Sequence, residues 1–175
     1  MSEKRETIVL GGGCFWCTEA CFNLVDGVIE ATPGYAGGSA SNPTYEQVCR
    51  GRTGHAEVVS VEFDPEQLGL DDVLEVFFAS HDPTLLNRQG ADVGTQYRSV
   101  ILYTSEDQKH EVERFIEEAQ KAYDRPIVTE VKELEEFYPA EEYHQRYFEK
   151  NPGQGYCRVV VAPKVAKIKD KLSVT

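Results

Sequence analysis

The strongest constraint on this chain is a run of three glycines before a cysteine, Gly11-Gly12-Gly13-Cys14. The apolar residues 7–10 before it are typical of a buried strand, and the apolar residues within 18–25 fall on one side of a helix. Glycines at this junction let the backbone turn sharply and leave space beside the next residue. That residue lies at the start of the predicted helix, where free N–H groups and the helix dipole favour a thiolate. We therefore expect Cys14 to be a nucleophile beside an apolar pocket formed by the exposed pair Phe15-Trp16.

Length and composition indicate an ordinary globular protein. With 175 residues, of which 41% are hydrophobic, the chain suits one catalytic domain over residues 1–175. The net charge of −12 argues against nucleic acid, because basic side chains gather only in the tail at 163–175. No apolar run approaches the roughly 20 residues of a membrane helix, and the N-terminus lacks the apolar core of a signal peptide. We expect a cytoplasmic monomer with a core at about 7–160 and a charged, poorly ordered tail.

Strand and helix patterns alternate along the chain. Apolar periodicity predicts strands at 7–10, 58–63, 97–103 and 127–131, and helices at 18–25, 70–80, 106–123 and 140–149. Two long stretches at 34–45 and 84–96, and the glycine-rich loop at 151–157, have no such periodicity, which is typical of functional loops. This order fits an α+β domain with a mainly antiparallel, mixed sheet flanked by helices.

The five cysteines do not predict a structural disulfide framework, because their number is odd and the chain is expected in a reducing compartment. Cys14 and Cys17 have C-x-x-C spacing, so one helix face brings their sulfurs together, either as a reactive pair or as thiols that only pack. A metal site would need a second matching pair, which is absent from the sequence, so we expect no metal. Cys21 and Cys49 are interpreted as buried and inert.

Glu57 and several tyrosines are further candidates. Glu57 precedes an apolar strand, so it is either a solvated strand-end carboxylate or a buried one, whose pKa would rise toward a proton-donating value. Tyr35, Tyr45 and Tyr97 lie in or beside the irregular loops, where each either packs or donates a hydrogen bond. The four histidines show no ligand spacing and are interpreted as structural: His55, His81, His110 and His144.

Seven short motifs occur in a fixed order over about residues 7–160. They are Gly13–Trp16, Gly34–Gly38, Pro43–Tyr45, Gly54–Glu57, His81–Pro83, Gly94–Ser99 and Gly155–Cys157. Together they resemble the A-type peptide methionine sulfoxide reductases. The resemblance implies a single-domain α/β roll and reduction of the S epimer of methionine sulfoxide, peptide-bound or free. It also implies a cycle without a bound cofactor, in which thioredoxin, or dithiothreitol in vitro, is the reductant.

The resemblance assigns the first half of the chemistry to the cysteine motif. Cys14 would attack the sulfoxide sulfur and become a sulfenic acid. Phe15 and Trp16 would form an apolar pocket for the substrate methyl group, and the placement of the oxygen opposite that methyl would select one epimer.

The resemblance places the oxygen-binding groups on other segments. Glu57, together with Tyr45 and Tyr97, would bind the sulfoxide oxygen and supply a proton. Asp92 matches a further position in the same pocket.

The chain departs from the common family pattern at the residue after the Gly-Cys-Phe-Trp motif. Cys17 stands where most members have glycine, and Cys157 occupies the usual place of the resolving cysteine. Cys17 is close to Cys14, but a disulfide across one helical turn is strained; Cys157 is expected on a flexible loop. We expect Cys14 to pair with one of them and the other to relay the disulfide to thioredoxin. The alternative is a non-catalytic protein, either a thiol redox sensor or a cysteine-ligated metal-binding module.

Overall fold

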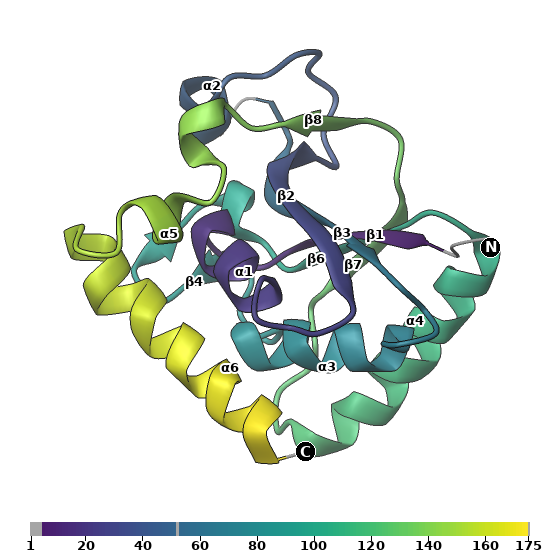
Figure 1. Ribbon diagram of the computed structural model, residues 1–175. Helices are drawn as coiled ribbons and strands as arrows, with labels where there is room; N and C mark the ends of the chain where they lie inside the picture. The colour runs from purple at the N-terminus through teal and green to yellow at the C-terminus, as the bar shows by residue number, and fades with distance from the viewer. Residues whose placement is uncertain (1–4, 52, 175) are drawn as a thin grey trace.

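The centre of the molecule is a six-stranded mixed sheet, seen in a computed structural model that describes residues 5–51 and 53–174 (Figure 1). Its strands lie in the order β7-β6-β1-β3-β2-β8, and only the β6–β7 pair is parallel. The predicted α+β class and the mainly antiparallel sheet are confirmed. The strands are β1 (Glu6–Gly11), β2 (Val28–Ala36), β3 (Ala56–Phe63), β6 (Val100–Tyr103), β7 (Glu130–Glu133) and β8 (Phe137–Pro139).

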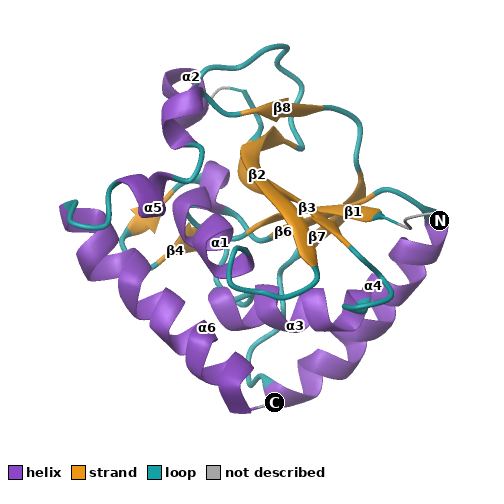
Figure 2. Ribbon diagram, viewed as in Figure 1, coloured by secondary structure: helices purple, strands orange, loops and turns teal. Residues whose placement is uncertain are grey.

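The longer helices gather on one side of this sheet, as Figure 2 shows. Helix α1 packs on strands β2 and β3, and α3 and α6 pack on α1 in turn. Buried side chains such as Ile8, Phe22 and Phe77 form the core between these layers. The helices are α1 (Phe15–Phe22), α2 (Tyr45–Cys49), α3 (Leu70–Ser80), α4 (Glu106–Ala119), α5 (Tyr147–Lys150) and α6 (Ala162–Val174). Helix α3 has the bounds that its apolar spacing predicts.

The second irregular stretch holds a small hairpin. Strands β4 (Arg88–Gln89) and β5 (Asp92–Val93) pair with each other and precede a 3-10 turn, η1 (Thr95–Tyr97). The predicted strand at 97–103 therefore starts only at Val100. The hairpin and the turn bring the loop to the start of α1, because the Gly13 N–H donates to the Tyr97 carbonyl at 3.1 Å.

The predicted helix at 140–149 is wrong. A 3-10 turn, η3 (Glu142–His144), is followed by Arg146 in a left-handed conformation with φ 54°, and α5 starts after it. The buried carboxylate of Glu19 on α1 accepts the Arg146 N–H at 2.9 Å. This contact between segments far apart in the sequence breaks a helix that local propensity favours.

The prediction of a poorly ordered tail is also wrong. Cys157 begins a π-helical turn, η4 (Cys157–Val161), which continues into α6, so Cys157 lies on a helix rather than on a flexible loop. Val161 and Ile168 are fully buried, and they lie seven residues apart on one face of this helix. Their burial holds the charged segment against the core.

None of the helices within the described residues has an apolar stretch of the length needed to cross a membrane.

Candidate active site

The glycine run places Cys14 at the start of α1, between the end of β1 and the loop that follows α3. A Cβ atom on Gly12 would lie 2.6 Å from the His81 ring, so only glycine fits there. Gly13 has φ +84°, which side chains rarely adopt. Cys14 then takes an extended conformation as the N-cap of α1. The tight turn thus presents the Cys14 side chain toward Glu57 and Tyr97.

The expectation that the helix N-terminus lowers the pKa of Cys14 is wrong for this resting state. Burial raises that pKa well above its usual value, and the charge of Glu57 raises it further. The backbone N–H of Trp16 acts in the opposite direction, as expected at a helix start, but it is outweighed. Cys14 therefore rests as a neutral thiol.

Glu57 is buried at the start of β3, as the sequence predicts. Its side chain is 1% exposed, and Oε1 accepts the Phe15 N–H at 3.1 Å. Burial raises the pKa of Glu57 to about 8, although the Phe15 N–H and the Cys14 thiol lower it. Oε2 finds no hydrogen-bond partner among the described residues. At neutral pH Glu57 is thus a protonated acid with an oxygen that is free to meet a ligand.

The structure brings Tyr45, Tyr97 and Asp92 to the same place. Burial is the main cause that raises the pKa of both tyrosines, and the charge of Glu57 is the second cause for each. Both hydroxyl groups therefore lie close enough to the Glu57 carboxyl to be affected by its charge. Asp92, in β5, raises the pKa of Glu57 and accepts a hydrogen bond from the Tyr156 hydroxyl. A cavity of about 700 Å³ reaches Asp92 and Tyr156 from the side of α6. Polar groups from two segments, the start of α2 and the stretch 92–97, therefore lie near the acid.

Phe15 and Trp16 differ in exposure. The expected exposed pair is therefore wrong for Phe15, which is buried, and only Trp16 is accessible. Phe15 is 1% exposed, and its ring lies 5.7 Å from that of Tyr35 and 6.4 Å from that of Tyr45. Trp16 is half-buried and stacks on Tyr147 with ring centroids 3.7 Å apart. Trp16 therefore forms the accessible apolar wall, and Phe15 supports it from inside.

Two residues of the segment 137–147 support this wall, although the sequence did not indicate a role for them in the site. Glu141 accepts hydrogen bonds from the Tyr35 hydroxyl at 2.8 Å and from the Tyr45 N–H at 2.9 Å. His144 lies against the rings of Phe15 and Tyr45, at 5.0 and 4.4 Å. The helix predicted over this segment gave no indication of these contacts, because they reach β2, α1 and α2 and join residues far apart in the sequence.

Two further thiols lie on the same side of the site, with Cys17 near Cys14 and Cys157 near Cys17. Cys17 and Cys157 are both at most 1% exposed and share an apolar cluster with Ala20 and Val161. Burial raises the pKa of Cys17 to about 11, and both Lys164 and the Tyr156 hydroxyl lower it. The Cys17 thiol is close enough to influence the pKa of Cys14, and Cys157 is close enough to influence that of Cys17.

The remaining cysteines are placed differently from each other. Cys21 is fully buried, as predicted, but Cys49 is exposed, so the prediction for Cys49 is wrong. The thiol of Cys49 lies beside the Tyr45 hydroxyl at the end of α2, and α2 projects from the edge of the fold (Figure 1). No group of three or more His, Cys, Asp or Glu side chains within the described part of the chain could hold a metal ion.

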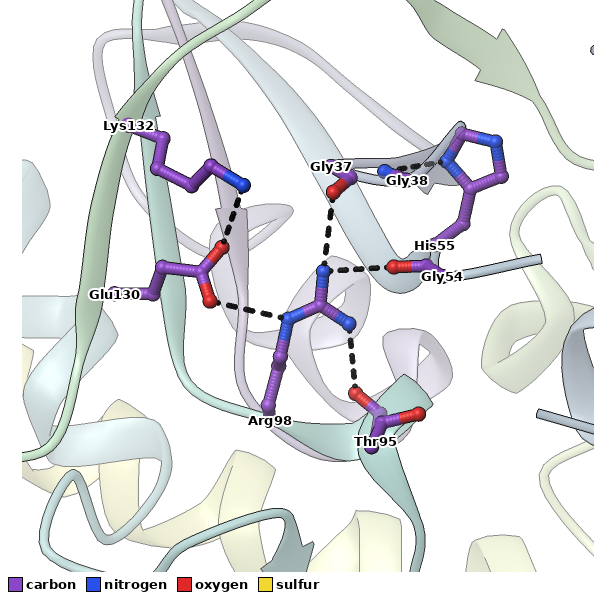
Figure 3. A network of polar contacts seen from close by, with 8 residues as sticks. All are labelled: Gly37, Gly38, Gly54, His55, Thr95, Arg98, Glu130 and Lys132. Carbon is purple, nitrogen blue, oxygen red and sulfur yellow. Dashed lines mark hydrogen bonds and ion pairs between the residues drawn. The ribbon is translucent and has the colours of Figure 1, made fainter. Parts of the chain in front are cut away.

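Arg98 joins the loops that carry the acid and one tyrosine, as Figure 3 shows. Its guanidinium donates to the carbonyl oxygens of Gly37, Gly54 and Thr95, at 3.3, 2.9 and 3.0 Å. It also forms an ion pair with Glu130 at 3.5 Å. Gly54 lies three residues before Glu57, and Thr95 lies two before Tyr97, so one side chain fixes both loops.

Comparisons with known proteins identify the family of this chain. A family model described as peptide methionine sulfoxide reductase matches residues 6–174. The chain belongs to the peptide methionine sulfoxide reductase family. The peptide methionine sulfoxide reductase MsrA of Haloquadratum walsbyi is 57% identical over 165 residues, which cover 94% of this chain and 95% of that protein.

Solved structures of the family have the same fold as this reductase. Reduced Mxr1 from Saccharomyces cerevisiae superposes with a TM-score of 0.84 at 38% identity, covering 88% of this chain and 90% of that one. Mxr1 in complex with Trx2 gives a TM-score of 0.61 at 28% identity, covering 84% of this chain and 87% of that one. The α/β roll inferred from the resemblance is therefore confirmed.

We expect Arg98→Lys to impair this reductase, because a single ammonium group cannot reach three carbonyl oxygens and a carboxylate at once. The loops that carry Glu57 and Tyr97 would then shift relative to each other, and kcat/KM should fall by about tenfold to a hundredfold. Steady-state kinetics with a methionine sulfoxide peptide measures this. Arg114→Lys, at an exposed position on α4, is the control, and equal activity of the two variants would contradict the prediction.

Proposed function

We propose that this reductase converts the S epimer of methionine sulfoxide, in peptides or as the free amino acid, to methionine with Cys14 as nucleophile. The observation that carries the proposal is the buried acid Glu57, with a pKa of about 8 and one free oxygen, beside the Cys14 thiol. A buried proton donor next to a nucleophile suits a substrate whose oxygen must be protonated before its bond to sulfur can break.

The proposed step transfers the oxygen from the substrate sulfur to Cys14. The Cys14 sulfur attacks the sulfoxide sulfur while Glu57 protonates the oxygen. The resulting hydroxyl group then bonds to the Cys14 sulfur, as the substrate sulfur loses its bonds to oxygen and to Cys14. Methionine leaves with two more electrons than the sulfoxide had, and Cys14, oxidised by two electrons, becomes a sulfenic acid. The proton of the thiol balances the proton given by Glu57, so the acid is restored.

Tyr45 and Tyr97 are proposed to bind the same oxygen. Their hydroxyl groups are protonated, because burial and the charge of Glu57 raise the pKa of each. Hydrogen bonds to an oxygen that gains negative charge become stronger in the transition state, which accelerates the step. These groups would hold the oxygen, and Trp16, supported by Phe15, would hold the methyl group. Once both are fixed, the two epimers differ in the positions of the sulfur lone pair and of the rest of the side chain, and only one of these arrangements would fit the site. Asp92 is proposed to border the pocket through its bond to Tyr156.

The sulfenic acid is proposed to be resolved by Cys17 and then by Cys157. Cys14 is the N-cap of α1 and Cys17 is the third helical residue, and the Cys17 N–H donates to the Cys14 carbonyl at 3.1 Å. In a capping box the side chain at each of these positions reaches the backbone of the other, so both side chains lie at the same end of the helix. Attack by the Cys17 thiol on the sulfenic acid forms a disulfide and releases water. Cys157 then attacks Cys17, in the shared cluster, and passes the disulfide to thioredoxin. The solved complex of yeast Mxr1 with Trx2 supports thioredoxin as the reductant.

The cycle requires free thiols at its start, so we propose that the protein acts in the cytoplasm, where thiols stay reduced. We also propose a monomeric enzyme without a bound cofactor, in which Cys14 is the nucleophile, Glu57 the acid and two further cysteines the resolving thiols.

Turnover of the separated epimers tests the function. We expect the wild type to reduce methionine S-sulfoxide, but not the R epimer, with dithiothreitol or thioredoxin, and Cys14→Ser to reduce neither. Cys21→Ser, at a buried thiol outside the proposed cycle, is the matched control. Product formation by Cys14→Ser, or no turnover by the wild type, would overturn the proposal; the second result is what a thiol redox sensor would give.

The pH profile tests Glu57 as the acid. Because its raised pKa is about 8, Glu57 is protonated at pH 7 and loses its proton as the pH rises, so kcat/KM should fall above about pH 8. Glu57→Gln should remove that limb and lower kcat by about 100- to 10,000-fold. Glu62→Gln, on the same strand but ion-paired with Arg5, should keep the wild-type profile. An unchanged alkaline limb in Glu57→Gln would assign the titration to another group.

Peptide mapping after one turnover tests the order of the thiols. We expect a Cys14–Cys17 disulfide to accumulate in Cys157→Ser and a sulfenic acid to persist longer at Cys14 in Cys17→Ser. Each variant should still release one methionine per enzyme but lose most of its thioredoxin-supported turnover, because the path outward is interrupted. Full recycling by both single variants would show that the relay does not operate.

A further inference from the structure

His144, interpreted as structural from the sequence, lies behind the accessible apolar wall of the site. It is 1% exposed and packs between the rings of Phe15 and Tyr45. Its Nδ1 lies 3.0 Å from the indole Nε1 of Trp16, in a hydrogen bond that joins residues 128 positions apart. His144 therefore contacts the wall through a directed polar bond as well as through packing.

The chemistry of the indole fixes the protonation state of His144. A tryptophan Nε1–H can only donate, so Nδ1 of His144 must accept and carries no proton. Burial lowers the pKa of His144, so the ring is neutral at physiological pH and its one proton lies on Nε2. Protonation of Nδ1 would remove the bond, and the neutral tautomer is thus required for it.

The other nitrogen of the ring makes this arrangement costly. Nε2 is buried, and the part of the chain that the structure describes offers it no hydrogen-bond partner. An unsatisfied buried donor destabilises the fold, a cost that a phenylalanine or leucine filling the same space would not have. The bond to Trp16 is the contribution of His144 that an apolar residue cannot replace.

Trp16 is held from several sides at once. Tyr147 stacks on one face of the indole at 3.7 Å with the planes 4° apart, and Tyr156 meets it edge-on at 5.7 Å. Stacking fixes the plane of a ring but allows rotation within that plane, whereas a hydrogen bond at Nε1 removes that rotation. His144 supplies this last restraint.

We propose that His144 is a positioning residue that fixes the orientation of Trp16 and thereby sets the size of the pocket for the substrate methyl group. The proposal rests on the proposed function for the identity of the methyl group, but the bond itself is a property of the protein alone. A loosely held indole would bind a methyl group less well and would exclude a larger alkyl group less strictly.

Trp16 is the only tryptophan of the chain, so its indole N–H gives one resolved NMR signal and its fluorescence reports one site. In the wild type we expect His144 to show the nitrogen shifts of a ring protonated at Nε2 and accepting at Nδ1. This measurement needs no variant and no substrate. A ring protonated at Nδ1, or an indole N–H with the shift of a solvent-exposed group, would overturn the proposal whether or not the enzyme turns over.

Two substitutions separate positioning from packing. His144→Phe keeps an aromatic ring but removes the acceptor, whereas His144→Asn places an amide oxygen near the position of Nδ1. We expect His144→Phe to shift the indole NMR signal and to raise KM about five- to tenfold with little change in kcat. The ratio of kcat/KM for methionine sulfoxide to that for ethionine sulfoxide should fall. His144→Asn should restore the indole signal and much of the preference.

The controls distinguish the possible outcomes. His110→Phe, at an exposed position on α4, should change none of these quantities. If His144→Phe is as active and as selective as the wild type, or if both variants lose activity in proportion to their loss of thermal stability, His144 has only a structural role. If His144→Phe does not fold, the wild-type NMR measurement and His144→Asn still decide the question.

Discussion

Burial of a carboxyl group against the start of a helix is the constraint on which the rest of the site depends. Glu57 accepts the Phe15 N–H, so the acid ties β3 to α1 and at the same time lies beside the thiol. Away from water both groups hold their protons, which explains why the helix dipole alone does not ionise Cys14. The resting site therefore carries a proton on the residue proposed to be the acid, and in the proposed reaction the Cys14 sulfur gains negative charge only as it attacks.

Local patterns in the sequence predict those parts of the fold that depend on local contacts. The apolar spacing of Leu70–Ser80 gives α3 its observed bounds, and the alternation before Asp64 gives most of β3. The candidate residues Cys14 and Glu57 lie together as expected, because each follows or opens a central strand. The apolar spacing within each of these elements matches the face that it buries, and this explains why periodicity suffices to predict them, although β3 also pairs with β1 and β2.

The other parts of the fold and of the site depend on contacts between residues that lie far apart in the sequence. Arg146 takes its left-handed conformation next to Glu19, a residue 127 positions away, and no local pattern shows this. Helix α6 forms where lysines dominate the sequence, because Ile168 finds a place in a core built by other segments. The elevated pKa of Cys14 and the exposure of Cys49 are likewise properties of the assembled fold. The segment that sequence analysis described least well, residues 137–161, is the one that supports the aromatic wall.

The π-helical turn that buries Cys157 has a consequence for selectivity among redox partners. A thiol with no exposed surface cannot react with small disulfides in the surrounding solution, so Cys157 is protected in the reduced protein, whereas Cys49 is exposed. In the proposed relay, a protein reductant would reach the Cys157 sulfur only when this turn opens. The proposed relay thus keeps its outermost thiol shielded until a protein reductant forms a contact that opens the turn.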